Sequence, residues 1–278
     1  MKPIPVVFHL GPIQVHTYGI GLALTFWFAY TYFHRRLRSA NLPDLWLSQG
    51  FLWIIGAAIV GARIVHVVAN SSYYLAQPGQ IPLIWHGGLS SYGGIVGGVV
   101  AGLYFLRKAS PPVQPLVVFD IITPVLLAAW SMGRLLGPQL MYGGGGRPTN
   151  AWYGLAYAGE SGRRIPVPIF QSIEDFLIYL VLLRVERYLR QRSAPPGLLL
   201  TIGLALWSIE RFFDEFLWLA VPRLWDAVEV FALLLLVLSI AASALLVRSW
   251  RRTAKHELGD PETSSDESSH KTSHETHS

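Results

Sequence analysis

The chain has 278 residues, of which 52% are hydrophobic and 14% are charged; its formal net charge is +5 and it contains no cysteine. A soluble domain carries about 25% charged residues, so this composition excludes an ordinary soluble protein. The lack of cysteine excludes disulfides, thiolate metal sites, iron–sulfur clusters and a cysteine nucleophile on this chain. The positive charge does not indicate nucleic acid, because the basic residues stand beside apolar stretches, as in membrane proteins.

Seven stretches are apolar enough to be candidates for crossing a bilayer, which takes about 20 residues. The sequence therefore predicts an all-α integral membrane protein with about seven transmembrane helices in one domain, residues 1–250. Seven spans suit a monomer. Residues 251–278 form a predicted disordered, polar, cytoplasmic tail, because they are too polar to bury a core. The predicted spans are about 15–33, 50–68, 88–106, 117–136, 167–183, 197–216 and 227–247.

The basic residues that flank the spans are unevenly distributed. One set of connecting segments holds 13 of them and the alternate set holds 5. Cytoplasmic segments are enriched in Lys and Arg, so the N-terminus is predicted to lie outside and the C-terminus in the cytoplasm. The larger set comprises Arg35, Arg36, Arg38, Arg107, Lys108, Arg184, Arg187, Arg190, Arg192, Arg248, Arg251, Arg252 and Lys255.

Arg134 lies near the outer end of the fourth span, and four glycines, 143–146, precede Arg147 in the loop that follows. A charged side chain at membrane depth is costly and usually faces a protein interior or a wet cavity. Glycine-rich backbone lets amide groups approach a phosphate closely, and guanidinium makes bidentate bonds to phosphate. The stretch therefore predicts a site for an anionic group, such as a phospholipid headgroup, at the outer membrane surface.

Two further arginines lie inside spans. Arg63 is in the second span, and Arg211 is in the sixth, where Glu215 follows one turn later on the same helix face. The alternative to a functional role is a structural ion pair with an acid such as Asp120 or Glu174, and this alternative stays open.

Several motifs, in order along residues 15–247, resemble those of the bacterial prolipoprotein diacylglyceryl transferases. The resemblance implies transfer of a diacylglyceryl group from phosphatidylglycerol to the lipobox cysteine thiol of a prolipoprotein signal peptide, giving a thioether and glycerol phosphate. It implies no metal or other cofactor, and an active site at the outer face of the bacterial cytoplasmic (inner) membrane. The motifs are Tyr18-Gly19, Gly61-Ala-Arg63, Trp85-x-Gly-Gly-Leu-Ser-x-x-Gly-Gly94, Gly133-Arg134-Leu, Gly146-Arg147-Pro148-Thr149, the segment 167–174 and Arg211-x-x-x-Glu215.

Site residues carry over from this resemblance position by position. Arg134 matches the essential arginine that is expected to bind the phosphate and stabilise the leaving group, an electrostatic role. Arg211 matches the second essential arginine. The remaining lipid-binding matches are Tyr18, Gly146, Arg147 and Glu215, with Gln139 at the position of an asparagine.

The chain departs from the family pattern at the expected histidine. Tyr92 stands at that position, and His86 lies six residues earlier. Either His86 takes over the role or no histidine base is needed, because a nearby arginine lowers the pKa of a thiol. In the fifth span, Pro168 stands at another histidine position, while Gln171 and Glu174 are retained.

Two other functions use the same residues. A transporter for an anionic lipid or solute would employ the intramembrane arginines, but the sequence has no long-period repeat of the kind many transporters have. A membrane scaffold would use the charges only to hold helices together. That interpretation leaves the four glycines and their flanking arginines unexplained.

Overall fold

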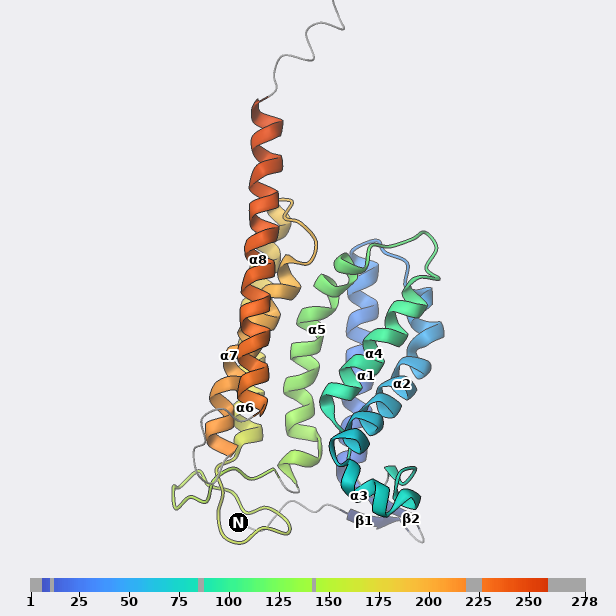
Figure 1. The fold of residues 1–278 in the computed structure, drawn as a ribbon, viewed down its shortest axis with the longest axis vertical. Helices are drawn as coiled ribbons and strands as arrows, with labels where there is room; N and C mark the ends of the chain where they lie inside the picture. Colours follow the sequence, from blue (N-terminus) through green and yellow to red (C-terminus); the bar gives the residue numbers. More distant parts are fainter. Residues whose placement is uncertain (1–6, 11–12, 85–87, 142–143, 219–226, 260–278) are drawn as a thin grey trace, which may run out of the picture.

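The structure, a computed structural model, describes residues 7–10, 13–84, 88–141, 144–218 and 227–259. Long helices run side by side and make up most of the described chain (Figure 1). The elements in order are β1 (Val7–Leu10), β2 (Ile13–His16), α1 (Thr17–Ser39), α2 (Leu45–Ala69), α3 (Ser71–Ala76), η1 (Pro78–Gln80), α4 (Ser91–Leu106), α5 (Pro115–Leu136), η3 (Pro138–Leu140), α6 (Val167–Gln191), α7 (Leu198–Trp218) and α8 (Ala227–Gly259).

The helices fit a membrane protein, as predicted from the sequence. By length and composition, α2, α5 and α8 are each able to cross a bilayer. α4 is also apolar, but it is shorter. Large apolar side chains also face outward, among them Leu52 at 78% exposure and Trp53 at 71%. Such a surface is unfavourable in water and is expected where a helix faces lipid. The short antiparallel hairpin of β1 and β2 is an element that the all-α prediction lacked.

Each predicted span coincides with a long helix, but several helices run further than the apolar stretch. α1 ends at Ser39, α6 at Gln191 and α8 at Gly259. Hydropathy marks only the apolar part, whereas Arg, Lys and Glu are good helix formers and continue the same backbone hydrogen bonding. The beginning of the predicted tail is therefore helical, and residues 260–278 lie outside the described residues.

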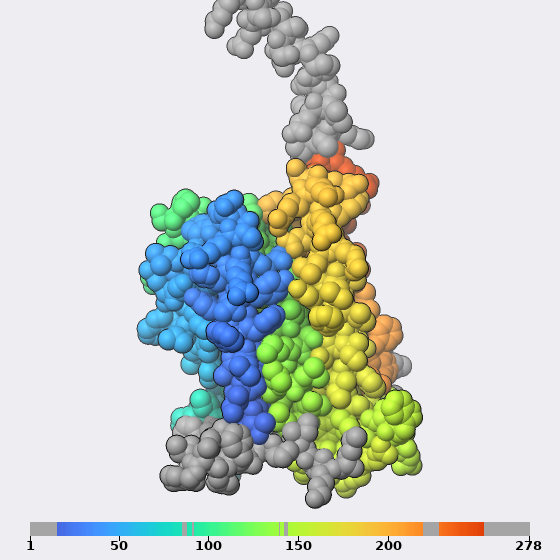
Figure 2. Space-filling view, turned by 180° about the vertical axis from the view of Figure 1, so that it is seen from behind, coloured from blue at the N-terminus to red at the C-terminus, as the bar shows by residue number. Residues whose placement is uncertain are grey.

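Helix α5 occupies a central place, between α1 and α6, as the face in Figure 2 shows. α2 packs on α4 through glycines: a side chain at Gly61 would collide with the backbone of Gly93, and one at Gly97 with that of Ala57. Close contact between small residues is a common way to pair helices in lipid.

An acid on α5 also fixes the start of α7. The carboxylate of Asp120 accepts hydrogen bonds from the backbone N–H groups of Gly197, at 2.7 Å, and Leu200, at 2.8 Å. The first amides of a helix lack partners within it, so this carboxylate caps α7. Asp120 is therefore a capping residue, and α7 is held against α5.

Candidate functional site

A cavity of about 380 Å³ lies between the start of α4, the end of α5, the second half of α7 and the start of α8. Its volume falls in the range of small-molecule sites, roughly 300–1,000 Å³. Four predicted site residues line it together, although they come from three different helices. The lining residues are Ser90, Tyr92, Ile95, Trp130, Arg134, Trp207, Arg211, Glu215, Trp218 and Val228.

Arg134 enters the cavity from the last turn of α5, beside two tryptophans. Its guanidinium carbon lies 5.7 Å from the centroid of the Trp130 ring. That ring meets the ring of Trp207 edge to face, with centroids 6.3 Å apart. The guanidinium thus lies over the Trp130 ring, and this cation–π contact stabilises its charge.

Arg211 is held by an acid one turn along α7. Its Nη2 lies 3.1 Å from Oε2 of Glu215, and the two side chains are 17% and 9% exposed. Nη1 of Arg211 is buried and has no hydrogen-bond partner among the described residues. A buried donor without an acceptor is costly, so Nη1 is suited to an oxygen of a bound ligand.

The tryptophans are site residues that the sequence analysis missed. Trp130 and Trp207 each precede an arginine of the cavity by four residues. On a helix this spacing places the two side chains on one face. The repeated pattern Trp-x-x-x-Arg, in two spans, was the signal that could have identified them.

α4 contributes Tyr92 to the lining of the cavity. Its ring meets that of Phe231 on α8 edge to face, with centroids 4.8 Å apart. Tyr92, at the position where the resemblance led us to expect a histidine, thus lies in the same cavity as both arginines. His86 lies outside the described residues.

Arg63 has a structural role. The side chain, 7% exposed, donates hydrogen bonds to the carbonyl oxygens of Gln80, at 2.6 Å, Ile81, at 2.8 Å, and Gly88, at 2.9 Å. These carbonyls belong to the segment that leads into α4. Arg63 therefore binds this segment through backbone oxygens, where the sequence analysis had considered a carboxylate partner.

The described end of the glycine loop, residues 144–147, is anchored within the protein. The N–H of Gly146 donates to the carbonyl of Ile165 and that of Arg147 to the carbonyl of Leu217, each at 2.9 Å. A side chain at Gly146 would collide with Leu217 and Val167. These two amides are therefore engaged by backbone carbonyls within the protein, and the expected contact of Gly146 and Arg147 with lipid stays a prediction. The glycine allows the loop to pack on the end of α7.

The other predicted site residues lie apart from the cavity lining. Tyr18 is at the start of α1, with its ring 5.1 Å from that of His16. Tyr18, Gly146 and Arg147 are not among the described residues that line the cavity. Gln139 belongs to η3, and its side chain lies outside the part that the structure describes.

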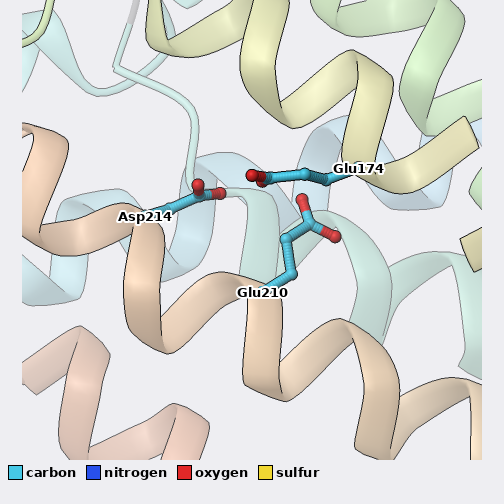
Figure 3. A group of neighbouring side chains, drawn as sticks. All are labelled: Glu174, Glu210 and Asp214. Carbon is cyan, nitrogen blue, oxygen red and sulfur yellow. The ribbon is translucent and has the colours of Figure 1, made fainter. Parts of the chain in front are cut away.

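Acidic side chains meet beside the cavity. Glu174 on α6 and Glu210 and Asp214 on α7 have carboxylate oxygens within 4.8 Å of one another (Figure 3). Glu210 directly precedes Arg211 of the cavity. These residues form the group of possible metal ligands found in the described part of the chain.

Several known proteins similar to this chain carry the same description. A family model described as prolipoprotein diacylglyceryl transferase matches residues 5–248. A phosphatidylglycerol–prolipoprotein diacylglyceryl transferase of Staphylococcus carnosus is 31% identical over 252 residues, which are 87% of this chain and 89% of the relative. A relative with the same name from Chloroherpeton thalassium is 32% identical, over 63% of this chain and 65% of the relative. In Fervidobacterium nodosum the identity is 31%, over 75% of this chain and 73% of the relative.

Proposed function

The chain belongs to the prolipoprotein diacylglyceryl transferase family, and from that premise we propose that it transfers the diacylglyceryl group of phosphatidylglycerol to a prolipoprotein cysteine thiol. The acceptor is the lipobox cysteine of the signal peptide. The observation that carries the proposal is the meeting of Arg134 and Arg211, from two helices, in one cavity. Two guanidinium groups suit a phosphodiester, which is anionic and accepts bidentate hydrogen bonds.

In this reaction the thiol loses its proton, and the sulfur forms a bond to the terminal glycerol carbon of the diacylglyceryl group. The bond from that carbon to the phosphate oxygen breaks, and its electron pair stays on the oxygen. The leaving glycerol phosphate gains negative charge as the bond breaks. Arg134 and Arg211 stabilise this charge, and Nη1 of Arg211 offers a donor for a phosphate oxygen.

The thiol proton passes to water or to the leaving glycerol phosphate, because the two arginines are already protonated and cannot accept it. A thiol has a pKa of about 8.5, and nearby cations favour the reactive thiolate. The two arginines therefore activate the incoming thiol electrostatically. His86 and Tyr92 are the proposed further catalytic residues, and the proposed lipid contacts outside the cavity lining are Tyr18, Gln139, Gly146 and Arg147.

The proposal includes a topology. Seven helices, α1, α2, α4, α5, α6, α7 and α8, span the bacterial cytoplasmic membrane of a monomer, with the N-terminus and the active site towards the outer face. The basic-rich ends of α1, α4, α6 and α8 lie at one end of the bundle, and the glycine loop lies at the other (Figure 1). This arrangement supports a cytoplasmic location of the basic end.

Single introduced cysteines test the topology, because the chain has none of its own. Ser161→Cys should react with a membrane-impermeant maleimide in intact cells, and Gln191→Cys only after lysis. The reverse labelling would contradict the orientation.

Transfer in vitro tests the reaction. Purified protein is mixed with phosphatidylglycerol vesicles and a lipobox peptide, and the mass of the peptide is followed. We expect a gain of one diacylglyceryl group, which Arg134→Ala and Arg211→Ala each abolish. Loss of transfer in His86→Ala would assign a role to that histidine, and Tyr92→His tests the family's usual residue. An unchanged peptide mass, with lipid and peptide bound, would refute the proposal, and movement of lipid without peptide modification would favour a transporter.

A further inference from the structure

A second cavity, of about 330 Å³, lies between α1, α5 and α6, three helices that Figure 2 shows side by side. Its lining includes Arg36, Arg187 and Arg190, and we refer to it as the basic cavity. Arg36 lies three residues before the end of α1, and Arg187 lies four residues before the end of α6. The basic cavity is therefore at the end of the bundle opposite the glycine loop (Figure 1).

The basic cavity is separate from the cavity that contains Arg134 and Arg211. Ile121, which lines the basic cavity, precedes Arg134 by thirteen residues on α5. At 1.5 Å per residue this separation is about 20 Å along the helix. A ligand of the basic cavity would therefore not contact the proposed active site.

The lining of the basic cavity has an excess of positive charge. Among the described residues that line it there are three arginines and one acid, Glu186, which leaves an excess of two positive charges. One oxygen of this acid, Oε1, pairs with Nη2 of Arg36 at 2.6 Å and with Nη2 of Arg190 at 3.0 Å. Arg187 forms no ion pair within the described part of the chain. Like charges in one cavity repel one another, and a bound anion relieves the repulsion.

Arg36 is fixed in the wall of the basic cavity. Its side chain is 13% exposed and bound to Glu186, and its Nε donates to the carbonyl oxygen of Ile121 at 3.0 Å. Arg187 is exposed, so its guanidinium group can turn toward a ligand that Arg36 holds. Guanidinium donates paired hydrogen bonds to phosphate oxygens. A phosphate group therefore suits the cavity.

Two tyrosines mark the depth of the basic cavity in the bilayer. Tyr32 on α1 lies one turn before Arg36, and its hydroxyl is 3.0 Å from that of Tyr179 on α6. Tyr179 lies eight residues before Arg187. Tyrosine is enriched at the boundary between the hydrocarbon and the headgroups. The arginines, which are closer to the helix ends than this tyrosine pair, are therefore expected at headgroup level.

An apolar surface continues from the tyrosine pair toward the middle of the bundle. On α1, the ring of Phe28 lies 5.7 Å from that of Tyr32. On α6, the ring of Phe176 lies 5.9 Å from that of Tyr179 and is 49% exposed. Phe176 precedes Arg187 by eleven residues, roughly 16 Å along the helix. This length is about half of the roughly 30 Å hydrocarbon core, the depth that the acyl chains of one leaflet fill.

We propose that the basic cavity binds the phosphate group of an anionic phospholipid, whose acyl chains lie over Phe28 and Phe176. Basic pockets between membrane helices bind anionic lipid headgroups in this way. The excess positive charge favours an anionic over a zwitterionic lipid, and the adjoining apolar surface favours a lipid over a free phosphate ion. The lipid would link α1 to α6 through Arg36 and Arg187 and so stabilise the bundle. Its assignment to the cytoplasmic leaflet rests on the proposed topology, whereas its binding does not.

Native mass spectrometry of the purified protein in detergent measures lipid binding at the basic cavity. Phosphatidylglycerol is the anionic probe and phosphatidylethanolamine the zwitterionic one. The double variant Arg187→Gln with Arg190→Gln removes two cations and keeps the pair of Arg36 with Glu186. We expect it to bind one phosphatidylglycerol fewer than the wild type, with the apparent Kd for that lipid raised at least tenfold. The two proteins should bind phosphatidylethanolamine alike.

Arg184→Gln with Arg192→Gln is the matched control. Both arginines are exposed at the same end of α6, and neither is among the described residues that line the basic cavity. This variant loses the same charge and should bind phosphatidylglycerol as the wild type does. Equal loss in the two double variants would show a general attraction to cations and overturn the proposal. Unchanged binding in the first double variant would also overturn it. Lipid held near Arg134 is common to all three proteins and cancels in the comparison.

Inorganic phosphate distinguishes a lipid headgroup from a free anion. The thermal unfolding midpoint is measured with phosphatidylglycerol and, separately, with inorganic phosphate. Phosphatidylglycerol should raise the midpoint of the wild type more than that of the Arg187→Gln, Arg190→Gln variant, and inorganic phosphate should change neither. A rise with inorganic phosphate in the wild type alone, without a difference in lipid binding, would assign the cavity to a free anion and overturn the lipid proposal. None of these measurements uses transfer activity, so failure here is distinct from failure of the proposed function.

Discussion

Arg211 and Glu215 are joined across one turn of α7, with Nη2 3.1 Å from Oε2, and both side chains line the cavity. The carboxylate engages one end of the guanidinium and fixes its orientation. The other end, Nη1, is buried without a hydrogen-bond partner among the described residues. Arg211 is therefore held in place by one amino group and offers the other to a ligand.

Arg211→Lys should lower kcat/KM for transfer at least tenfold, which corresponds to about 1.4 kcal/mol. Lysine keeps the charge but lacks the planar fork, so it cannot bind Glu215 and a phosphate oxygen in the same fixed geometry. Initial rates with phosphatidylglycerol vesicles measure the effect, and circular dichroism checks that the variant is folded. A lysine variant with the wild-type rate would show that only the charge matters.

Arg63→Met should reduce stability by about 3 kcal/mol or more. The substitution removes the hydrogen bonds that the buried guanidinium donates to the carbonyls of Gln80, Ile81 and Gly88, and a hydrogen bond from a charged group contributes about 1.5–3 kcal/mol. The thermal unfolding midpoint of the purified protein measures the loss. The control is Arg107→Met, at an exposed position, which should change stability by no more than about 0.5 kcal/mol. Equal midpoints for the two variants would contradict this role of Arg63.

The sequence predicted the positions of the long helices because each apolar stretch is bounded by charges or turn residues. It also predicted that Arg134 and Arg211 belong to a functional site, since a charged side chain inside an apolar stretch is costly and usually faces a protein interior or a wet cavity. Both residues do lie in one cavity. The sequence does not reveal that the backbone N–H groups of Gly146 and Arg147 donate to the carbonyls of Ile165 and Leu217. The expected lipid contacts of these two residues stay predictions.

The sequence does not show which faces of the helices pack against one another. Periodicity shows that Glu210 and Asp214 share a face of α7, but not that this face meets Glu174 on α6. The same limit applies to Trp207, whose contact with Trp130 depends on how α5 packs beside α7. Helix pairing in a membrane is set by side-chain packing over long sequence separations, which a single sequence does not display.

The α2–α4 interface allows one substitution to be compared at two glycines of the same helix. Gly97→Ala should destabilise the protein by about 1–3 kcal/mol, because the new methyl group would collide with the backbone of Ala57. Gly102→Ala meets no atom within 4 Å and should stabilise it by about 0.5–1 kcal/mol, as alanine favours the helix. Unfolding of both variants in the same detergent gives the comparison. Destabilisation by Gly102→Ala, or none by Gly97→Ala, would contradict the packing.

Tyr157 lies in the loop between α5 and α6. Its titration should make the free energy of unfolding change with pH in the range above pH 10. Its side chain is 2% exposed, and its hydroxyl has no hydrogen-bond partner in the described residues. Burial raises the pKa of Tyr157 from 10.0 to about 12, since the tyrosinate anion is poorly solvated there. The unfolded chain releases this proton at lower pH than the folded protein, so stability should fall as pH rises from 10 towards 12.

Tyr157→Phe removes this dependence, because phenylalanine keeps the ring and has no proton to lose. At pH 8 the variant should be at least as stable as the wild type, since a buried hydroxyl without a partner has been removed. Between pH 9 and pH 11 its unfolding midpoint should fall less steeply than that of the wild type. The difference between the two curves isolates Tyr157 from other groups that titrate in this range. Parallel curves would mean that the Tyr157 hydroxyl titrates alike in the folded and unfolded chains, and that burial in this loop does not exclude the anion.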